Sequence, residues 1–432
     1  MEIRDPVHGS IPIRSEEEPI LEHAFFQRLR NIKQLGLSEY AFPGATHTRY
    51  LHSIGVFHLT TQLFDKLFAN ACIEKKDYER LKETVRLAAL LHDIGHAPLS
   101  HSTELVMPLK KDLAMPNAFL EDGLAQASHE DYTIKAIVDS SFTESFKKIK
   151  NKYGIEVNEI AGLIRGRPVD SNYFIINNKN YFPVLSQMIS SEIDCDRMDY
   201  LLRDSYFCGV SYGKFDVDWI FDNLQFVSTS DGEHLGLTER AIATFDDFLL
   251  SRFHMFLMVY FHYRAVCLEQ MLYQYFSSKD NEYFFPKNIE EYITHDDHYL
   301  MKLLRRSNNK WAKMVVANKI PLKVFEIFGS HNIKKFEEIK EYLESNSIEK
   351  IICESRGRLS KYYQASNKIA EKKTLPLYII KQYADKNGPY LDLTKATDVF
   401  DKYSKAHEVK RIHALISENG PELNDINKII AQ

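Results

Sequence analysis

The run Leu90–His96, with the sequence Leu-Leu-His-Asp-Ile-Gly-His, places two imidazoles and a carboxylate at the end of an apolar segment, Val85–Leu91, which is expected to be helical. A hydrophobic helix end is a costly place for three ionisable side chains unless something binds them there. Histidine nitrogen and aspartate oxygen together suit a divalent metal such as Mn²⁺, Fe²⁺, Zn²⁺ or Ni²⁺. The alternative is a pair of hydrogen-bonded core histidines beside a capping aspartate, and the run alone does not decide between the two.

Other parts of the chain supply further candidate ligands. Nine of the 17 histidines fall within the first 129 residues, and a cluster of three aspartates, Asp194, Asp196 and Asp199, follows later. One upstream histidine, the His-Asp pair and one downstream aspartate make a four-ligand set: His52, His92, Asp93 and Asp196. Such a set leaves coordination positions for water and a phosphate oxygen on a six-coordinate metal, which favours the metal interpretation.

The composition is that of a soluble globular protein, because 44% of the 432 residues are hydrophobic and 27% are charged. The five cysteines have no short paired spacing, so we expect a reduced cytoplasmic setting with neither a disulfide nor a cysteine-based zinc site. The first residues lack the apolar core of a signal peptide. The most apolar later stretch, Phe248–Phe261, is too short to cross a membrane, and we expect no membrane contact.

Charge is unevenly distributed along the chain. The net charge is −5, yet residues Met301–Gln432 carry more lysine and arginine than aspartate and glutamate. A basic face can bind polyanions or an acidic neighbouring subunit, although a spread of lysines is more often only a solvated surface. Weak nucleic-acid binding through this C-terminal part is therefore an open alternative.

Hydrophobic periodicity predicts a mainly α protein, with a helical core over residues 1–285 and a smaller basic α+β region over 286–432. Residues 1–15 are expected to form a strand or hairpin, and residues 106–127 a loop. The later part has expected strands at Lys350–Cys353 and Leu375–Ile380 and expected helices at Phe336–Glu344 and Asp398–Ile416. In the core, helices are expected at 22–36, 50–69, 80–93, 129–140, 156–165, 184–204 and 240–278.

The expected helix 184–204 has one buried stripe and one polar face beside it. Asp196 lies on the polar face, next to the core, where a metal would explain an otherwise costly carboxylate. Asp199 lies four residues before Arg203, and we interpret this pair as a salt bridge.

Several long motifs occur in a characteristic order from Asp5 to about Met271: Asp5–Gly9, Phe26–Gly36, Phe42–Ser53, His92–His101, the pair His129 and Glu130, and Asp196–Asp204. Together they resemble the HD-domain deoxynucleoside triphosphate triphosphohydrolases, which include bacterial enzymes and a vertebrate enzyme with a sterile-alpha-motif domain. The resemblance implies an HD-domain helical core, followed by a C-terminal region with an oligomerisation or regulatory role.

The resemblance also implies catalytic roles. His52, His92, Asp93 and Asp196 match the family's metal ligands for Mn, Fe, Ni, Zn or Mg, with a further Mg²⁺ on the substrate triphosphate. Water activated by the metal would attack the α-phosphorus and release triphosphate and a deoxynucleoside. His101 matches a general acid near the leaving 5′ oxygen. Glu104 and His129 match a carboxylate–imidazole pair beside it, although relatives often have Asp at the Glu104 position, and Glu130 matches a residue that orients this cluster.

Substrate contacts follow from the same motifs. Phosphate-contact positions are occupied by Arg49, Arg197, Tyr200 and Arg252, and His96 matches a residue used either for packing or for phosphate contact. Sugar-contact positions are occupied by Gln34, Leu35, Asp204 and Tyr260. Gln34 and Asp204 can hydrogen-bond a 3′ hydroxyl, and the Tyr260 ring would pack where a 2′ hydroxyl needs space.

Relatives of this kind are often tetramers with activating nucleotides at the interface, so we expect a homo-oligomer, dimer or tetramer. Glu22, Gln27 and Arg30 match positions of that regulatory pocket. The lysine that precedes the Asp-Pro motif in the family has no counterpart here, and Trp219 replaces a basic residue used by some members.

The predicted function is metal-dependent hydrolysis of deoxynucleoside triphosphates, with activation by nucleotide as an added expectation. One alternative is another HD phosphohydrolase, such as a nucleotidase or a phosphodiesterase. A second alternative is an HD regulatory module that senses nucleotide or nucleic acid without catalysis.

Overall fold

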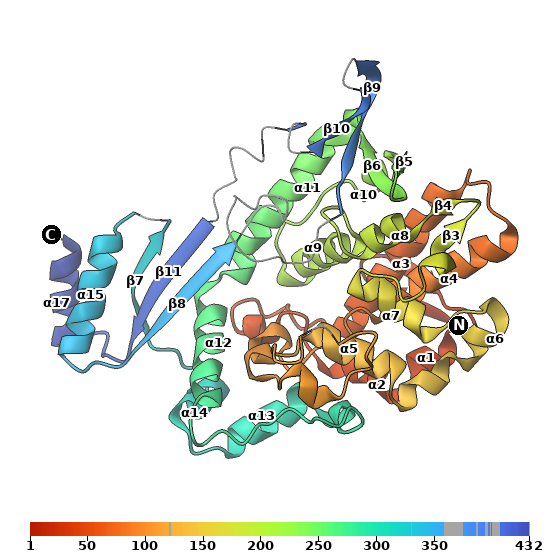
Figure 1. Cartoon of the computed structure of the whole chain (residues 1–432). Helices are drawn as coiled ribbons and strands as arrows, with labels where there is room; N and C mark the ends of the chain where they lie inside the picture. The colour runs from red at the N-terminus through yellow and green to blue at the C-terminus, as the bar shows by residue number, and fades with distance from the viewer. Residues whose placement is uncertain are drawn as a thin grey trace.

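A computed structural model describes residues 1–120, 122–329, 331–357, 375–385, 388–393, 396, 397, 399 and 407–431. A large helical body carries the N-terminus, and a small sheet with two helices projects from one side and carries the C-terminus (Figure 1). This arrangement confirms the prediction of a mainly α protein with a smaller α+β C-terminal region.

The α-helices are α1 (Glu18–Glu22), α2 (Ala24–Arg28), α3 (Arg49–Phe68), α4 (Lys75–Leu91), α5 (His129–Val138), α6 (Lys147–Tyr153), α7 (Val157–Arg165), α8 (Phe182–Ile189), α9 (Cys195–Cys208), α10 (Val217–Asp222), α11 (Ile242–Met255), α12 (Tyr263–Phe276), α13 (Asp297–Arg306), α14 (Lys310–Val316), α15 (Ile333–Ser345) and α17 (Pro421–Ala431). Short 3₁₀ turns include η3 (Ser100–Val106) and η4 (Lys110–Leu113), and Phe256–Tyr260 forms a π-helical turn.

The strands are β1 (Glu2–Asp5), β2 (Gly9–Pro12), β3 (Ile175–Ile176), β4 (Lys179–Asn180), β5 (Leu224–Ser228), β6 (Glu233–Thr238), β7 (Leu322–Phe328), β8 (Lys350–Gly357), β9 (Tyr378–Asp385), β10 (Gly388–Asp392) and β11 (His407–Ala414). They form two hairpins, β1-β2 and β3-β4, and two larger sheets in the orders β10-β9-β6-β5 and β7-β11-β8. Only the β6–β9 pairing is parallel among the described strands.

Helix α3 lies at the centre of the body. Helices α4 and α9 pack against it, and most of its residues are buried. A helix that is covered on most sides is expected to have apolar residues around most of its circumference. Helix α4 packs beside α3 and ends at Leu91, and its last turn is buried. His92 and Asp93 therefore follow directly after a buried helix end, as the sequence predicts. The expected helices at 50–69, 80–93, 129–140 and 156–165 are confirmed as α3, α4, α5 and α7, and the expected hairpin within residues 1–15 is confirmed as β1-β2.

The expected helix 184–204 is wrong as a single element, because the chain forms α8 and α9 with an extended break between them. Ser190 leaves the helical region with φ −145° and ψ 93°. Asp194 then starts α9 as its N-cap, since its carboxylate accepts the N–H of Arg197 at 2.8 Å. The first helix therefore ends at Ser190, and the capping Asp194 begins the second.

The expected helix 240–278 is also divided. Helix α11 passes into the π-helical turn Phe256–Tyr260, and α12 starts after His262, whose Nδ1 accepts the N–H of Arg264 at 3.4 Å. A π turn inserts an extra residue into a helix and is frequent at functional sites. The expected helix 22–36 is likewise broken, because Ile32 is extended and Lys33 pairs with Thr48 in an isolated bridge.

The expected helix Asp398–Ile416 is wrong over its second half, where β11 forms the middle strand of the sheet β7-β11-β8. Residues 398 and 400–406 lie outside the described part of the chain. Charged residues in this segment suggest an exposed helix face, but Arg411 is buried and pairs with Glu326 on β7. That partner allows a charged residue to occupy a central strand.

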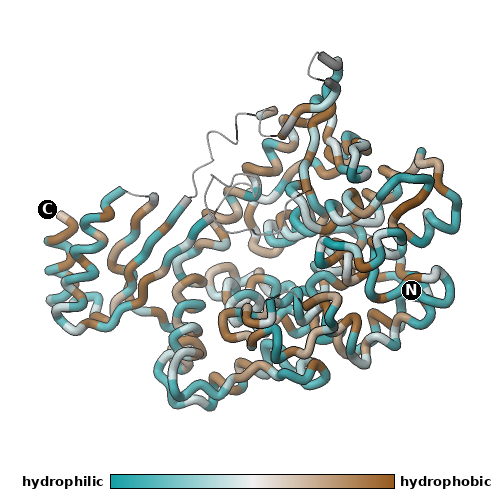
Figure 2. Tube along the Cα trace, viewed as in Figure 1, coloured by the Kyte–Doolittle hydropathy of each residue, from teal (hydrophilic) through white to brown (hydrophobic). Residues whose placement is uncertain are grey.

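The described residues form two apolar cores. One fills the helical body, and the second lies between one face of β7-β11-β8 and the helices α15 and α17. Hydrophobic and hydrophilic stretches alternate along these helices, as Figure 2 shows by colour. Strands β9 and β10 add to the sheet of β5 and β6, so the later part of the chain also returns to the body. Across the described ranges, the longest apolar helical stretch falls short of a membrane span.

Gly55 on α3 lies against Asp199 and Arg203 of α9. A Cβ atom there would lie 1.8 Å from Asp199 Oδ1 and 2.3 Å from an Arg203 guanidinium nitrogen. We predict that Gly55→Ala forces these helices apart, breaks a buried ion pair and lowers the free energy of unfolding by about 3 kcal/mol or more. Urea denaturation followed by circular dichroism measures the change.

The matched control is Gln62→Ala, an exposed position on the same helix, where the change should stay within about 0.5 kcal/mol. A Gly55→Ala protein with an unchanged denaturation midpoint would show that the two helices can separate freely.

Candidate metal centre

The four predicted metal ligands come together from three parts of the fold. His52 lies on α3, His92 and Asp93 follow the end of α4, and Asp196 lies in the first turn of α9. The Nε2 atom of His52 is 3.0 Å from an Asp196 oxygen and 3.6 Å from an Asp93 oxygen. The Nε2 atom of His92 is 3.4 Å from Asp93 and 3.6 Å from Asp196. The two Nε2 atoms and the two carboxylates therefore surround one small volume.

Contacts behind the imidazoles fix their orientation. His52 Nδ1 lies 2.8 Å from Asp199 Oδ2, and His92 Nδ1 lies 2.8 Å from the carbonyl oxygen of Ala89. In metal sites the second ring nitrogen commonly bonds a carboxylate or a backbone carbonyl in this way, which leaves Nε2 to face the metal. His92 Nε2 is buried and makes no well-formed hydrogen bond within the described ranges.

The electrostatics of the four residues fit a divalent cation. Burial disfavours a charge on His52, but Asp196 and Asp199 outweigh it and raise its pKa to about 10. Burial is likewise outweighed at His92, where Asp93 and Asp196 raise the pKa. The carboxylates thus favour positive charge at this place, which protonated imidazoles supply, and a divalent metal ion would supply it while His52 and His92 bind the ion in their neutral form.

Arg49 connects this centre to the turn that follows it. Its guanidinium donates to Asp93 and, through Nε, to Ser100 Oγ at 2.8 Å. Leu99 and Ser100 both adopt left-handed backbone conformations, with φ of 57° and 59°. Asp297 accepts the N–H of Leu99 at 2.6 Å and thereby supports this strained turn.

A second cluster adjoins the first. Glu104 Oε1 lies 2.5 Å from His129 Nδ1 and 3.2 Å from His101 Nδ1. The His96 ring stacks on His129 with 3.9 Å between centroids, and its Nε2 lies 3.2 Å from Asp93. Burial opposes ionisation of Glu104, but hydrogen bonds from His101 and His129 outweigh it and hold its pKa below its usual range. The longer arm of Glu104 therefore reaches both imidazoles.

The members of this second cluster differ in exposure. The side chain of His101 is 67% exposed, whereas that of His96 is 1% exposed, so His101 is accessible to a molecule in solution. Glu130 lies next to His129 in the chain, but its carboxylate lies 3.7 Å from Arg165.

The predicted sugar-contact residues also lie together. Asp204 Oδ1 lies 2.7 Å from His47 Nε2, and its Oδ2 accepts a hydrogen bond of 2.8 Å from the Tyr260 hydroxyl. The N–H of Gln34 donates to the carbonyl of His47 at 3.0 Å. The side-chain oxygen of Gln34 is buried and accepts no hydrogen bond from the described residues, and Leu35 is partly buried beside it in sequence. An acceptor of this kind can receive a hydroxyl donor.

Two predicted phosphate-contact arginines pair with acidic residues of the break before α9. Arg197 Nη1 lies 2.7 Å from Asp194, and Arg252 Nη1 lies 3.5 Å from Glu192. Tyr200 follows Asp196 by one helical turn, and its ring centroid is 6.3 Å from that of Tyr260.

The predicted regulatory residues lie near the surface around α1 and α2. Glu22 and Arg30 are exposed. Arg30 Nε donates to Gln27 Oε1 at 2.7 Å, and the guanidinium lies 3.6 Å from the ring centroid of Tyr50. Gln27 also donates to the carbonyl of Leu21 at 2.7 Å.

Residues without a sequence-derived role complete the site. His8 Nε2 lies 2.6 Å from Asp199 Oδ1, and Asp5 accepts from Arg203 at 2.8 Å. His47 holds Asp204, as described above. All three belong to the motifs Asp5–Gly9 and Phe42–Ser53, but only the tertiary structure shows which carboxylate or guanidinium each one contacts. The predicted salt bridge between Asp199 and Arg203 is confirmed at 2.8 Å.

We predict that His92→Ala and Asp196→Ala remove bound divalent metal, since each deletes a ligand from a set of four. Loss of metal should lower any hydrolytic activity by at least about 10³-fold. Metal content after dialysis, measured by mass spectrometry, is the direct test, and circular dichroism should show a retained helical fold.

The matched control is His298→Ala, an exposed histidine on α13, which should keep its metal. Full metal occupancy in both ligand variants would contradict the assignment.

Comparison with known proteins places this centre within a family. The HD domain model matches residues 49–204, which begin with α3 and end within α9. An uncharacterised protein of Mycoplasma pneumoniae is 31% identical over 374 residues, which are 78% of this chain and 79% of that protein. The crystal structure of a hypothetical protein from Aquifex aeolicus superimposes with a TM-score of 0.73 and 25% identity, over 100% of this chain and 99% of that one.

A Dictyostelium discoideum protein named as a homologue of deoxynucleoside triphosphate triphosphohydrolase SAMHD1 is 28% identical over 288 residues. The match covers 64% of this chain but only 49% of that longer protein. Residues 49–204, which the HD domain model matches, include the His-Asp pair and all four predicted ligands. The chain therefore belongs to the HD-domain family of metal-dependent phosphohydrolases.

Proposed function

We propose that the protein hydrolyses deoxynucleoside triphosphates to a deoxynucleoside and inorganic triphosphate. The observation that supports this most is the arrangement of α9, where Asp196, Tyr200 and Asp204 follow one another at four-residue intervals and so share one face. The predicted metal ligand Asp196 lies at one end of that face, and Asp204, which accepts a hydrogen bond from the Tyr260 hydroxyl, lies at the other. A phosphatase that recognises only the phosphate group would not need the Asp204–Tyr260 end, because that end would contact a sugar.

The metal end would bind the α-phosphate. A divalent ion held by His52, His92, Asp93 and Asp196 supplies Lewis acidity and lowers the pKa of water. Arg49 keeps Asp93 ionised, because burial is outweighed by His92 and Arg49, which hold the pKa of Asp93 well below its usual range. The same arginine brings a fixed positive charge to the place where phosphate oxygens would approach.

Further fixed cations would hold the β- and γ-phosphates, which reach the site with a Mg²⁺ ion. Arg197 and Arg252 flank the start of α9, and Tyr200, which is half-buried, lies one helical turn after Asp196. Guanidinium groups suit phosphate because they donate several hydrogen bonds in one plane.

The cluster of His101, Glu104 and His129 is proposed to move the proton. The lowered pKa of Glu104 keeps its carboxylate ionised between the two imidazoles that it contacts. Exposed His101 can then donate a proton to the leaving 5′ oxygen, while His129 and His96 keep the carboxylate in place. Glu130, paired with Arg165, anchors the start of α5 behind His129.

The sugar end would select deoxyribose. His47 and Tyr260 hold the two oxygens of Asp204, which still have lone pairs for a 3′ hydroxyl, and the unpaired Gln34 oxygen offers a second acceptor. Leu35 and the Tyr260 ring close the space beside C2′. Placing a hydroxyl there leaves it unpaired, which costs about 1 to 3 kcal/mol.

Nucleotide activation and assembly into a homo-oligomer are part of the proposal. Arg30 stacks on Tyr50 of α3, close in sequence to Arg49 and His52, and Glu22 and Gln27 lie on the same surface. A nucleotide bound there between subunits would therefore act on the helix that carries a metal ligand. Deoxynucleoside triphosphates are the proposed ligands of both sites.

Product analysis tests the function directly. With dGTP and Mn²⁺ or Mg²⁺, we predict deoxyguanosine and intact triphosphate in equal amounts, because attack at the α-phosphorus expels the 5′ oxygen. Ion-exchange chromatography and phosphorus NMR identify the products, and the His92→Ala variant is the control. Release of dGMP and pyrophosphate, or turnover of nucleoside monophosphates or cyclic nucleotides alone, would favour a different HD phosphohydrolase. Tight nucleotide binding without any turnover would favour a sensing module.

Sugar selection gives a second prediction. Rates on dGTP should exceed those on GTP by about one to two decades, from the cost of an unpaired hydroxyl against an apolar ring. Tyr260→Ala should admit GTP and lose some turnover of dGTP, since ring packing is removed. Steady-state kinetics with dGTP and GTP, which carry the same base, measure both effects.

The matched control is Tyr260→Phe, which keeps the ring and removes only the hydroxyl that bonds Asp204, so it should keep most of the discrimination. Asp204→Ala should lower activity on both sugars alike. Unchanged selectivity in Tyr260→Ala would mean that this ring is only a packing residue.

A further inference from the structure

We propose that the protein binds a zinc ion at a second, buried site made by Cys267, Cys353 and His413, separate from the HD centre. The Sγ atoms of the two cysteines and one imidazole nitrogen all lie within 4.8 Å of one another. All three side chains are fully buried. The proposal departs from the expectation, drawn from cysteine spacing, that the chain has no cysteine-based zinc site.

The fold places the three residues on facing elements. Cys267 lies on α12, Cys353 on β8 and His413 on β11. In the β11–β8 ladder, Arg411 is opposite Cys353 and His413 is opposite Ile351, so Cys353 and His413 are diagonal neighbours on one face. Helix α12 packs against β8, and this face of the sheet meets the helical body there.

His413 is oriented toward the cysteines by two features. The β11–β7 register shifts between Ile412 and His413, and a bulge of this kind redirects a side chain. Its Nδ1 then lies 3.1 Å from the carbonyl oxygen of Pro321. Its Nε2 is buried and has no hydrogen-bond partner among the described residues. A buried nitrogen left in this way is costly, and a bound metal ion would remove the cost.

The donor set identifies the kind of metal. Thiolate ligands select zinc, copper(I) or iron–sulfur clusters, and imidazole suits zinc and copper. Two thiolates and a neutral imidazole balance the charge of Zn²⁺, whereas they would leave a net negative charge around copper(I) in a buried place. Zinc therefore fits best, with three protein ligands and one position left for water.

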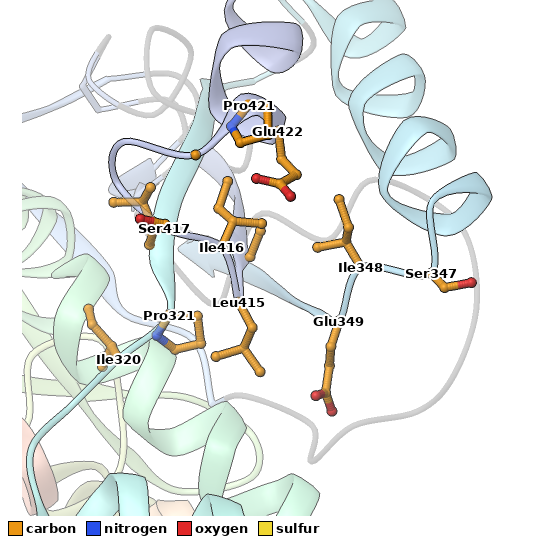
Figure 3. A pocket seen from close by; sticks show the side chains of 13 residues that line it. Ile320, Pro321, Ser347, Ile348, Glu349, Leu415, Ile416, Ser417, Pro421 and Glu422 are labelled. Carbon is orange, nitrogen blue, oxygen red and sulfur yellow. The ribbon is translucent and has the colours of Figure 1, made fainter.

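A hollow lies beside the backbone that flanks His413. An open hollow of about 680 Å³ lies against the sheet, and Pro321 and Ala414, which adjoin His413 through a hydrogen bond and through the chain, are among the residues that line it (Figure 3). A zinc ion here would join α12 of the body to β8 and β11 of the projecting sheet. Its binding free energy would then stabilise the connection between the two cores.

Cobalt substitution tests the proposal, because thiolate ligands give Co²⁺ a charge-transfer absorption in the near ultraviolet that the nitrogen and oxygen ligands of the HD centre cannot produce. The full-length chain is reduced, stripped of metal with a chelator and titrated with CoCl₂. We expect this absorption to saturate at one thiolate-bound Co²⁺ per chain and to disappear when Zn²⁺ is added. Protein purified without added metal should retain one zinc per chain in the His92→Ala variant, whose HD centre is impaired.

Cys267→Ser and Cys353→Ser should each abolish the absorption, and His413→Ala should weaken Co²⁺ binding at least tenfold. The matched control is Cys72→Ser, an exposed cysteine, which should leave the spectrum unchanged. Three results would overturn the proposal: no thiolate-to-cobalt absorption in reduced wild-type protein, copper in place of zinc in the protein as purified, or a Cys267–Cys353 disulfide without metal binding after reduction. The first of these needs no variant, so a variant that fails to fold leaves the test intact.

Discussion

The rest of the site depends on the contacts of one buried carboxylate, that of Asp199. It faces His8 from the N-terminal hairpin, His52 from α3 and Arg203 from its own helix. Burial alone would raise its pKa, but Arg203, His52 and His8 outweigh burial and hold the pKa well below the usual range. Removing one member of such a group leaves an uncompensated buried charge, a loss of about 3 to 5 kcal/mol. The same interaction therefore stabilises the fold and aims a metal ligand.

Packed helices position some of the predicted site residues, and turns position the others. Helix α9 carries Asp196 and Asp204, and α3 carries His52, whereas His92 and Asp93 lie in the turn after α4. Tyr260, at the proposed sugar site, is the last residue of the π-helical turn. Its hydroxyl donates a hydrogen bond to Asp204 on α9. The exposed member is His101, on the short turn η3 beside the left-handed residues Leu99 and Ser100. The proposed sugar contacts Asp204 and Tyr260 and the proposed proton donor thus come from different kinds of structure.

Much of this could be predicted from the sequence because its signals are local. The His-Asp run at the end of an apolar helix and the periodicity of α3, α4, α5 and α7 lie within single segments, and motif order brought His52 and Asp196 into the same ligand set. The break between α8 and α9 could not be predicted so easily, since Asp194 continues a helical pattern and only its capping contact reveals the interruption. β11 was misread because Arg411 looks exposed until Glu326 is seen beside it. The cluster of Cys267, Cys353 and His413 had no sequence signal at all.

The parallel pairing of β6 with β9 has a consequence for the order in which the chain acquires its structure. Thr238 pairs with Ile380, so the two strands are made far apart in time during translation, by roughly 7 to 30 s at about 5 to 20 residues per second. Until β9 emerges, one edge of β6 has no strand to pair with, and unpaired edges invite association with other chains. The last of the four predicted metal ligands, Asp196, is synthesised well before β9. A nascent chain therefore carries all four predicted ligands while this strand edge is still open to association with neighbouring chains.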